Sequence, residues 1–142
     1  MRKYINISFI YAIAAIVCGV FYREFTKLTG FSGKTSLAFA HTHMFVLGMA
    51  VFLIIAGFSA ITDLTGQKQF KPFMLLYNTG LPFMVAMLFA RGIPQALEIE
   101  LSPGASAAIS GMAGIAHIIM TIAVVLLFMA LRNSHVTARP SK

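Results

Sequence analysis

The chain has 142 residues, of which 58% are hydrophobic and 11% charged, and its formal net charge is +7. Soluble domains average about 45–50% apolar and about 25% charged residues. The composition therefore excludes an ordinary soluble domain, a disordered chain and a collagen-like fibre, and it indicates a bilayer protein. The length allows one domain, which we expect to be a single transmembrane domain covering residues 1–142.

Four apolar runs have about the 20 residues that a membrane-spanning helix needs. They are Tyr4–Tyr22, Leu37–Ile61, Pro72–Arg91 and Ser106–Leu131. Transmembrane strands are shorter and alternate polar with apolar residues, so we predict an all-α fold, an integral membrane four-helix bundle. Pro82 lies inside the third run and should kink or loosen that helix. The polar chain from Asn133 onwards is expected to fray.

Lysine and arginine predict the orientation, because they are enriched in cytoplasmic loops. With four spans, the N-terminus, the second connection and the C-terminus share one side. That side holds seven of these residues, namely Arg2, Lys3, Lys68, Lys71, Arg132, Arg139 and Lys142. The other side holds four, namely Arg23, Lys27, Lys34 and Arg91. We therefore expect both termini to be cytoplasmic.

The positive charge does not indicate a nucleic-acid partner. The charges are dispersed over loops and ends, with no basic helix and no platform of aromatic and basic residues. Contact with anionic lipid explains them better. The single cysteine, Cys18, lies in the first run, and the chain has no C-x-x-C-H motif for covalent haem.

Three histidines lie inside the apolar runs, at His41, His43 and His117, while His135 lies in the tail and is expected to be solvated. An ionisable residue within a membrane span marks a candidate functional site. Neutral imidazole is also the commonest metal ligand in proteins. The alternative is that each histidine only forms a hydrogen bond to a neighbouring helix.

The spacing of His41 and His43 predicts opposite directions, because residues two apart on an α-helix point about 200° apart. Each histidine therefore has its own apolar face. The face of His41 includes Phe45, Gly48 and Phe52, and that of His43 includes Leu47, Ala50 and Ile54. Gly48 leaves space for a flat ligand or for a close helix.

The segment from His41 to Gly48 reads H-x-H-x-x-x-L-G. It resembles the corresponding helix of C-family haem-copper oxygen reductases and related nitric-oxide reductases. It is also similar to the histidine motifs of small haem-binding membrane proteins linked to the nitric-oxide response. The whole chain looks like a bacterial family of uncharacterised four-span proteins, which implies the bacterial cytoplasmic (inner) membrane.

In the oxidase helix, the first histidine binds the high-spin haem and the second binds the low-spin haem. The resemblance therefore implies that His41 and His43 each face a haem b or metal site. It places Phe45 and Gly48 beside the cofactor and makes His117 a further ligand or a partner of a ligand. The phenyl ring of Phe45 would pack against a porphyrin or face lipid.

The oxidase core has twelve helices in three arcs of four, and this chain resembles one arc. The resemblance implies a homotrimer with haem between helices. The fourth run carries small residues at a spacing that suits close helix packing. They are Ser106, Ala107, Ser110, Gly111 and Gly114. This packing would lie between copies or within one bundle.

The chain also departs from the oxidases. It lacks the further histidines of their copper site, and no Asp or Glu lies within a span. We therefore expect no proton pumping, and leave open whether the chain is an oxidoreductase related to these families. The expected function is non-covalent b-type haem binding, in electron transfer, haem handling or binding of O2 or NO. Its partners would be the lipid bilayer, further copies of the chain and an electron donor.

Copper is the alternative cofactor, because thioethers together with imidazoles bind Cu(I). No Met-x-x-Met pair lies next to the histidines in the chain. The methionines within the runs are Met44, Met49, Met84, Met87, Met112 and Met120. Two further hypotheses are a small metal or proton transporter or channel, with histidines lining its path, and a structural membrane subunit.

Overall fold

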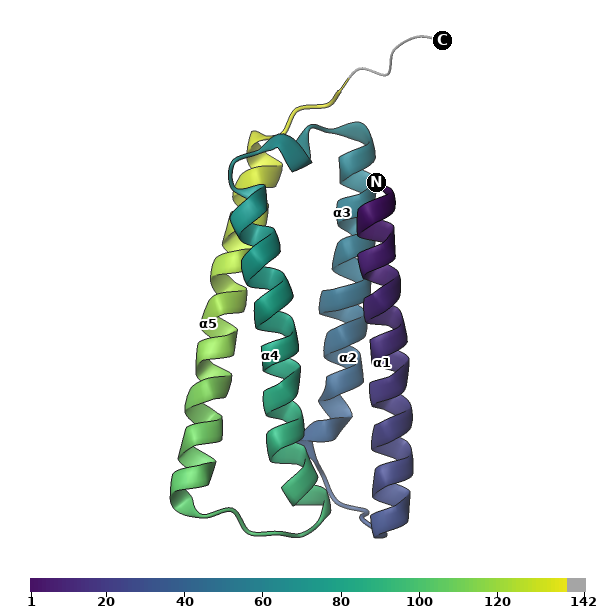
Figure 1. The fold of residues 1–142 in the computed structure, drawn as a ribbon, viewed down its shortest axis with the longest axis vertical. Coiled ribbons are helices and arrows are strands. Elements are labelled where there is room, and N and C mark those ends of the chain that lie inside the picture. The colour runs from purple at the N-terminus through teal and green to yellow at the C-terminus, as the bar shows by residue number, and fades with distance from the viewer. Residues whose placement is uncertain (138–142) are drawn as a thin grey trace.

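Four long antiparallel helices make up the computed structural model, which describes residues 1–137 (Figure 1). They are α1 (Arg2–Thr29), a second helix over Ser36–Ile61, α4 (Phe70–Ala96) and α5 (Pro103–Asn133). The described residues form no strand beyond an isolated bridge between Thr62 and Val136. The predicted all-α class is confirmed.

The second helix changes its winding along its length. It begins with a 3₁₀ turn, η1 (Ser36–Phe39), continues as α2 (Ala40–His43), widens into the π-helical segment η2 (Met44–Ala50) and ends as α3 (Val51–Ile61). The assumption of a regular α-helix is therefore wrong directly after the paired histidines. π-helical turns inside α-helices are rare and occur frequently at functional sites.

Helices α1 and α5 extend beyond the apolar runs, as far as the residues that cap them. Helix α1 continues past Tyr22 to Thr29 and stops at Gly30, whose φ of 68° is the left-handed conformation that glycine tolerates. Helix α5 begins at Pro103, and the hydroxyl of Ser102 accepts a hydrogen bond from the Ala105 amide. Hydropathy thus locates the lipid-sized part of each helix, while capping residues set its ends.

Helix α4 contains two prolines, Pro82 and Pro94, yet it is a single helix over Phe70–Ala96. Proline removes one internal hydrogen bond from a helix. Neighbouring helices can compensate for such a loss in a membrane protein. The expected disturbance at Pro82 therefore does not divide the third span.

The helices do not form a closed ring. Helix α1 packs against the second helix and also touches α4, and α4 packs against α5. Helix α5 also touches the short turn η3 (Leu64–Gly66). Within residues 1–137, α5 makes no close backbone contact with α1 or the second helix. Helix α4 contacts both the second helix and α5, and it therefore lies between them.

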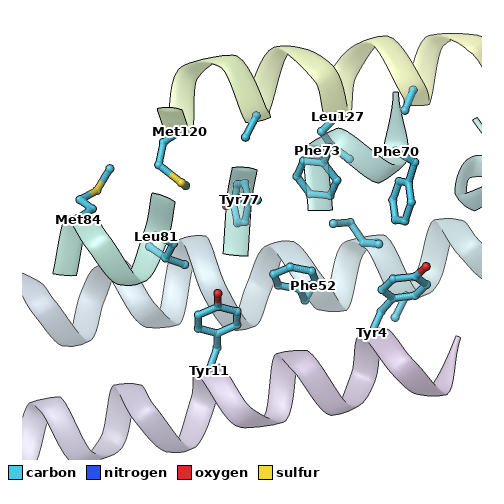
Figure 2. Packing of buried hydrophobic residues seen from close by; sticks show 14 of the residues in the cluster. Tyr4, Tyr11, Phe52, Phe70, Phe73, Tyr77, Leu81, Met84, Met120 and Leu127 are labelled. Carbon is cyan, nitrogen blue, oxygen red and sulfur yellow. The ribbon is translucent and has the colours of Figure 1, made fainter. Parts of the chain in front are cut away.

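Aromatic rings join the helices at the centre of the core (Figure 2). The ring of Tyr11 on α1 stacks on Phe52 of the second helix at 5.6 Å, and Phe52 meets the edge of Tyr77 on α4 at 5.8 Å. Met120 and Leu127 of α5 extend the same buried cluster on the other side of α4. The core thus runs through all four helices.

The outer surface of the helices is apolar. Large hydrophobic side chains are exposed along it, for example Phe9, Val17, Val125 and Phe128. All four helices are long and apolar enough to cross a membrane. These features are those of a multi-pass membrane protein whose outer surface contacts lipid.

The N-terminal end of α1, the connection after Ile61 and the C-terminal end of α5 lie at one end of the molecule (Figure 1). The amide of Asp63 donates to the carbonyl of His135 at 3.1 Å, and the His135 amide donates to the Asp63 carboxylate at 2.7 Å. The expected fraying from Asn133 is therefore wrong for residues 134–137. Arg139 and Lys142 lie outside the described residues.

Candidate functional site

Two of the three span histidines line the same hollow. His43 on α2 and His117 on α5 face a hollow of about 240 Å³ that opens between the second helix and α5. We name it the histidine groove. Its remaining lining residues are Ser36, Phe39, Met84, Met87, Leu88, Arg91, Ile109 and Ala113.

The two imidazoles of the groove are held in the same way. The Nδ1–H of His43 donates to the carbonyl of Phe39, and the Nδ1–H of His117 donates to the carbonyl of Ala113, both at 2.7 Å. A carbonyl oxygen only accepts, so Nδ1 must carry the proton. In the neutral imidazole, Nε2 then keeps its lone pair. Metal-ligating histidines commonly have this arrangement.

Helix α4 supplies the floor of the groove. Its lining residues Met84, Met87, Leu88 and Arg91 follow the spacing i, i+3, i+4, i+7, which places them on one helical face. The thioethers of Met84 and Met87 and the guanidinium of Arg91 therefore line the same groove as the two imidazoles. Within residues 1–137, no three His, Cys, Asp or Glu side chains form a group that could hold a metal ion.

Gly92 brings the start of the second helix close to Arg91. A Cβ on Gly92 would lie 2.5 Å from the Leu37 nitrogen, so only glycine allows this approach. The Thr35 hydroxyl donates to the Gly92 carbonyl at 2.7 Å, and the Ser36 amide donates to the Gln95 side chain at 2.8 Å. These contacts fix one wall of the groove at the end where Arg91 lies, which is the outer end if the predicted orientation holds.

Arg91 carries the only charge among the residues that line the groove. Its guanidinium donates to the Ser106 carbonyl at 3.0 Å and to the Ser110 hydroxyl at 2.7 Å, both neutral acceptors on α5. All four acidic residues of the chain lie within residues 1–137, and the one ion pair there joins Arg23 to Glu24. Arg91 therefore has no carboxylate partner in this part of the chain.

His41 lies on another side of the second helix and does not join the groove. Its ring packs against α1, where a Cβ on Gly19 would lie 3.6–4.0 Å from three His41 side-chain atoms. The Nδ1 of His41 is buried and has no hydrogen-bond partner within the described residues. His41 and His43 thus face different sides, as their spacing predicts, but the backbone orients only the ring of His43.

The other two expected cofactor residues also lie on the second helix. The space beside Gly48 is filled by α1, because a Cβ there would lie 2.6–2.7 Å from the side chain of Tyr11. Gly48 is expected to leave space for either a flat ligand or a close helix, and in the structure a close helix fills this space. Phe45 is partly buried and does not line the histidine groove.

The glycines among the small residues of α5 have no close neighbour on another helix within residues 1–137. A Cβ on Gly111 or on Gly114 would meet nothing within 4 Å. Ser106 and Ser110 instead hold Arg91. The spacing of small residues therefore leaves an open surface on α5.

Sequence reasoning missed three residues of the groove. In the sequence, Arg91 is only a charge at the end of a span, and Met84 and Met87 are two of six methionines within the runs. The helical spacing from Met84 to Arg91 was the signal that places all three on one face. Folding brings this Met-x-x-Met pair beside His43 and His117, although it lies far from them in the chain.

The chain is thus a four-helix protein with a candidate cofactor site. The site is an apolar groove in which backbone carbonyls orient two histidines. Residues 1–134 match the model of a family described as "Protein of unknown function (DUF2871)". The chain belongs to this family. No curated protein and no solved structure matches it, so the comparisons show no relationship to haem-copper oxidases.

Proposed function

We propose that the protein is a multi-pass membrane protein that binds a b-type haem non-covalently in the histidine groove, with His43 and His117 as the iron ligands. The observation that carries the proposal is the matched pair of Nδ1–H bonds to the carbonyls of Phe39 and Ala113. Both bonds leave Nε2 free for iron. Neither imidazole bonds to another helix, which argues against a role limited to joining helices.

The lining of the groove fits a porphyrin chemically. Phe39, Leu88 and Ile109 offer apolar contacts, and because the hollow holds only about 240 Å³, a porphyrin would extend beyond it. Ligand sites are typically apolar with a few placed polar groups. A bound haem would supply reversible one-electron chemistry, tuned by its axial ligands.

If His43 and His117 both bound the iron, electron transfer would be favoured over the binding of O2 or NO, because no coordination position would remain open. In this proposal His43 and His117 hold the iron from different helices, and α4 closes the floor. His41 is not a ligand of this site. Haem handling and gas binding would each need one of the two imidazoles to dissociate.

The test is an optical spectrum of the protein purified from haem-replete cells, oxidised and reduced, with and without carbon monoxide. We expect a Soret band and no carbon monoxide shift. His43→Ala and His117→Ala should each lose the signature of two imidazole ligands, while His41→Ala retains it. A colourless wild type that stays colourless after haem is added would overturn the proposal.

Copper is the second candidate, and the position of Met84 and Met87 favours it. Their thioethers line the same groove as the two imidazoles, and this ligand set suits Cu(I). Metal analysis of the same sample distinguishes the candidates. One copper per chain, lost in both His43→Ala and Met84→Leu, would replace haem as the assignment.

The homotrimer and the bacterial inner membrane also belong to this proposal. The open surface around Gly111 and Gly114 supports close packing between copies, because nothing in the described chain covers it. An electron donor would be the further partner of a haem with two histidine ligands.

A further inference from the structure

Arg91 has an unusual position for a charged residue. It is partly buried, it is the last residue of the third apolar run and it borders a hollow lined by Phe39, Leu88 and Ile109. Charged side chains within membrane spans usually pair with one another or with backbone carbonyls. The partners of Arg91 are one backbone carbonyl and one hydroxyl, and neither carries a charge.

The contacts of Arg91 also fix its direction. Both measured hydrogen bonds come from one terminal nitrogen, Nη2, which donates to the Ser106 carbonyl and the Ser110 hydroxyl. A guanidinium has five N–H donors in a rigid fork. Its other N–H groups have no acceptor within residues 1–137. They can bind a carboxylate with the geometry that favours arginine over lysine.

We propose that Arg91 binds a carboxylate of the ligand in the histidine groove, so that the groove selects an amphipathic anion. This inference rests on the proposed haem site. The ring system lies against the apolar floor, and a haem carboxylate lies at the outer end beside Arg91. Ser110 is a positioning residue that holds the guanidinium at this end. The ligand's carboxylate neutralises the one charge of the groove.

The experiment compares haem with haem dimethyl ester, whose carboxylates are blocked. Both are titrated into the full-length protein in a zwitterionic detergent without anionic lipid, and the Soret change reports binding. Wild type should bind haem roughly ten- to hundred-fold more tightly than the ester, as expected for a charge-assisted hydrogen bond. Arg91→Gln should lose this preference while it binds the ester about as well as wild type.

Two matched variants complete the design. Lys34→Gln removes the same charge at the same end of the molecule, but Lys34 does not line the histidine groove, so the preference should persist. Arg91→Lys keeps the charge and loses the fork, and it should retain part of the preference. The Soret position of the bound ester shows whether each variant keeps an intact histidine site.

The outcomes separate the two proposals. If neither porphyrin binds to wild type, the haem site itself is wrong. If both bind equally well to wild type, the haem site stands and the role of Arg91 is wrong. A preference that survives unchanged in Arg91→Gln would also overturn the inference, because another group would then bind the carboxylate.

Discussion

The surroundings of His41, His43 and His117 determine which of these imidazoles is oriented to bind a metal. The backbone carbonyl four residues earlier fixes the protonated nitrogen of His43 and of His117. His41 has no such partner, and its Nδ1 is buried against α1. The local hydrogen bond therefore decides which imidazoles are prepared to bind a metal, because it sets both the tautomer and the ring orientation.

A substitution at Gly48 tests whether the side of the second helix that carries His41 packs closely against α1. Gly48→Ala places a Cβ about 2.6 Å from the Tyr11 ring, so the ring must move. Overpacking of this kind costs roughly 1–3 kcal/mol. Gly57→Ala is the matched control, because a Cβ there meets open space. We expect a lower free energy of unfolding in detergent for Gly48→Ala only. Equal stability of the two variants would show that α1 does not restrict this position.

The individual histidines of the candidate site were predictable from the sequence. The way in which its residues come together was not. His43 and His117 are identifiable in the sequence because ionisable groups are rare in apolar runs. Their pairing was not predictable, since it depends on α4 separating the second helix from α5. The contacts of Arg91 were not predictable for the same reason, because its neutral partners lie on α5.

At the scale of the elements, the π-helical segment distinguishes the second helix. Its carbonyls receive donors from two other helices, the Tyr77 hydroxyl on Leu47 at 2.7 Å and the Ser8 hydroxyl on Met49 at 2.8 Å. A disturbed helix in a bilayer is stabilised when neighbouring helices satisfy its backbone groups. Hydropathy cannot predict such a segment, because the same apolar residues suit either winding.

Tyr77→Phe tests this support, since it removes one hydroxyl and keeps the ring in the core. Hydrogen bonds between membrane helices contribute about 0.6 kcal/mol on average and up to about 1.7 kcal/mol. We expect a loss of unfolding free energy in this range. Tyr22→Phe is the control, because the Tyr22 hydroxyl has no recorded partner in residues 1–137 and the change should be neutral. Equal effects of the two substitutions would contradict a specific role for the Tyr77 hydroxyl.

For the whole molecule, the four spans were predictable because their composition is extreme, and the arrangement of the helices was not. The apolar runs predict the number and order of the helices, and polar caps extend them at the ends. The groove depends on α5 packing on α4 while staying clear of the second helix. The order of the helices does not specify that choice. Ala116, Ala123 and Ala130 of α5 are all buried and lie seven residues apart, so one side of α5 faces the core.

The sidedness of the molecule remains a prediction, and the fold makes it directly testable. The connection after Ile61 and the ends of α1 and α5 share one end, whereas the start of α5 lies at the other (Figure 1). Among residues 1–137, the first end carries five lysine and arginine residues and the other end four, so the first end should be cytoplasmic. Thr65 and Gly104 are exposed positions at the two ends.

The prediction is checked by introducing Thr65→Cys or Gly104→Cys into a chain that carries Cys18→Ala. A membrane-impermeant maleimide should label Gly104→Cys in intact cells and Thr65→Cys only after lysis, because the reagent reaches only the outer side of a closed membrane. The reverse pattern would place both ends of the described chain outside the cytoplasm. It would also move Arg91 and the outer end of the histidine groove to the cytoplasmic side, so that a ligand would enter from within the cell.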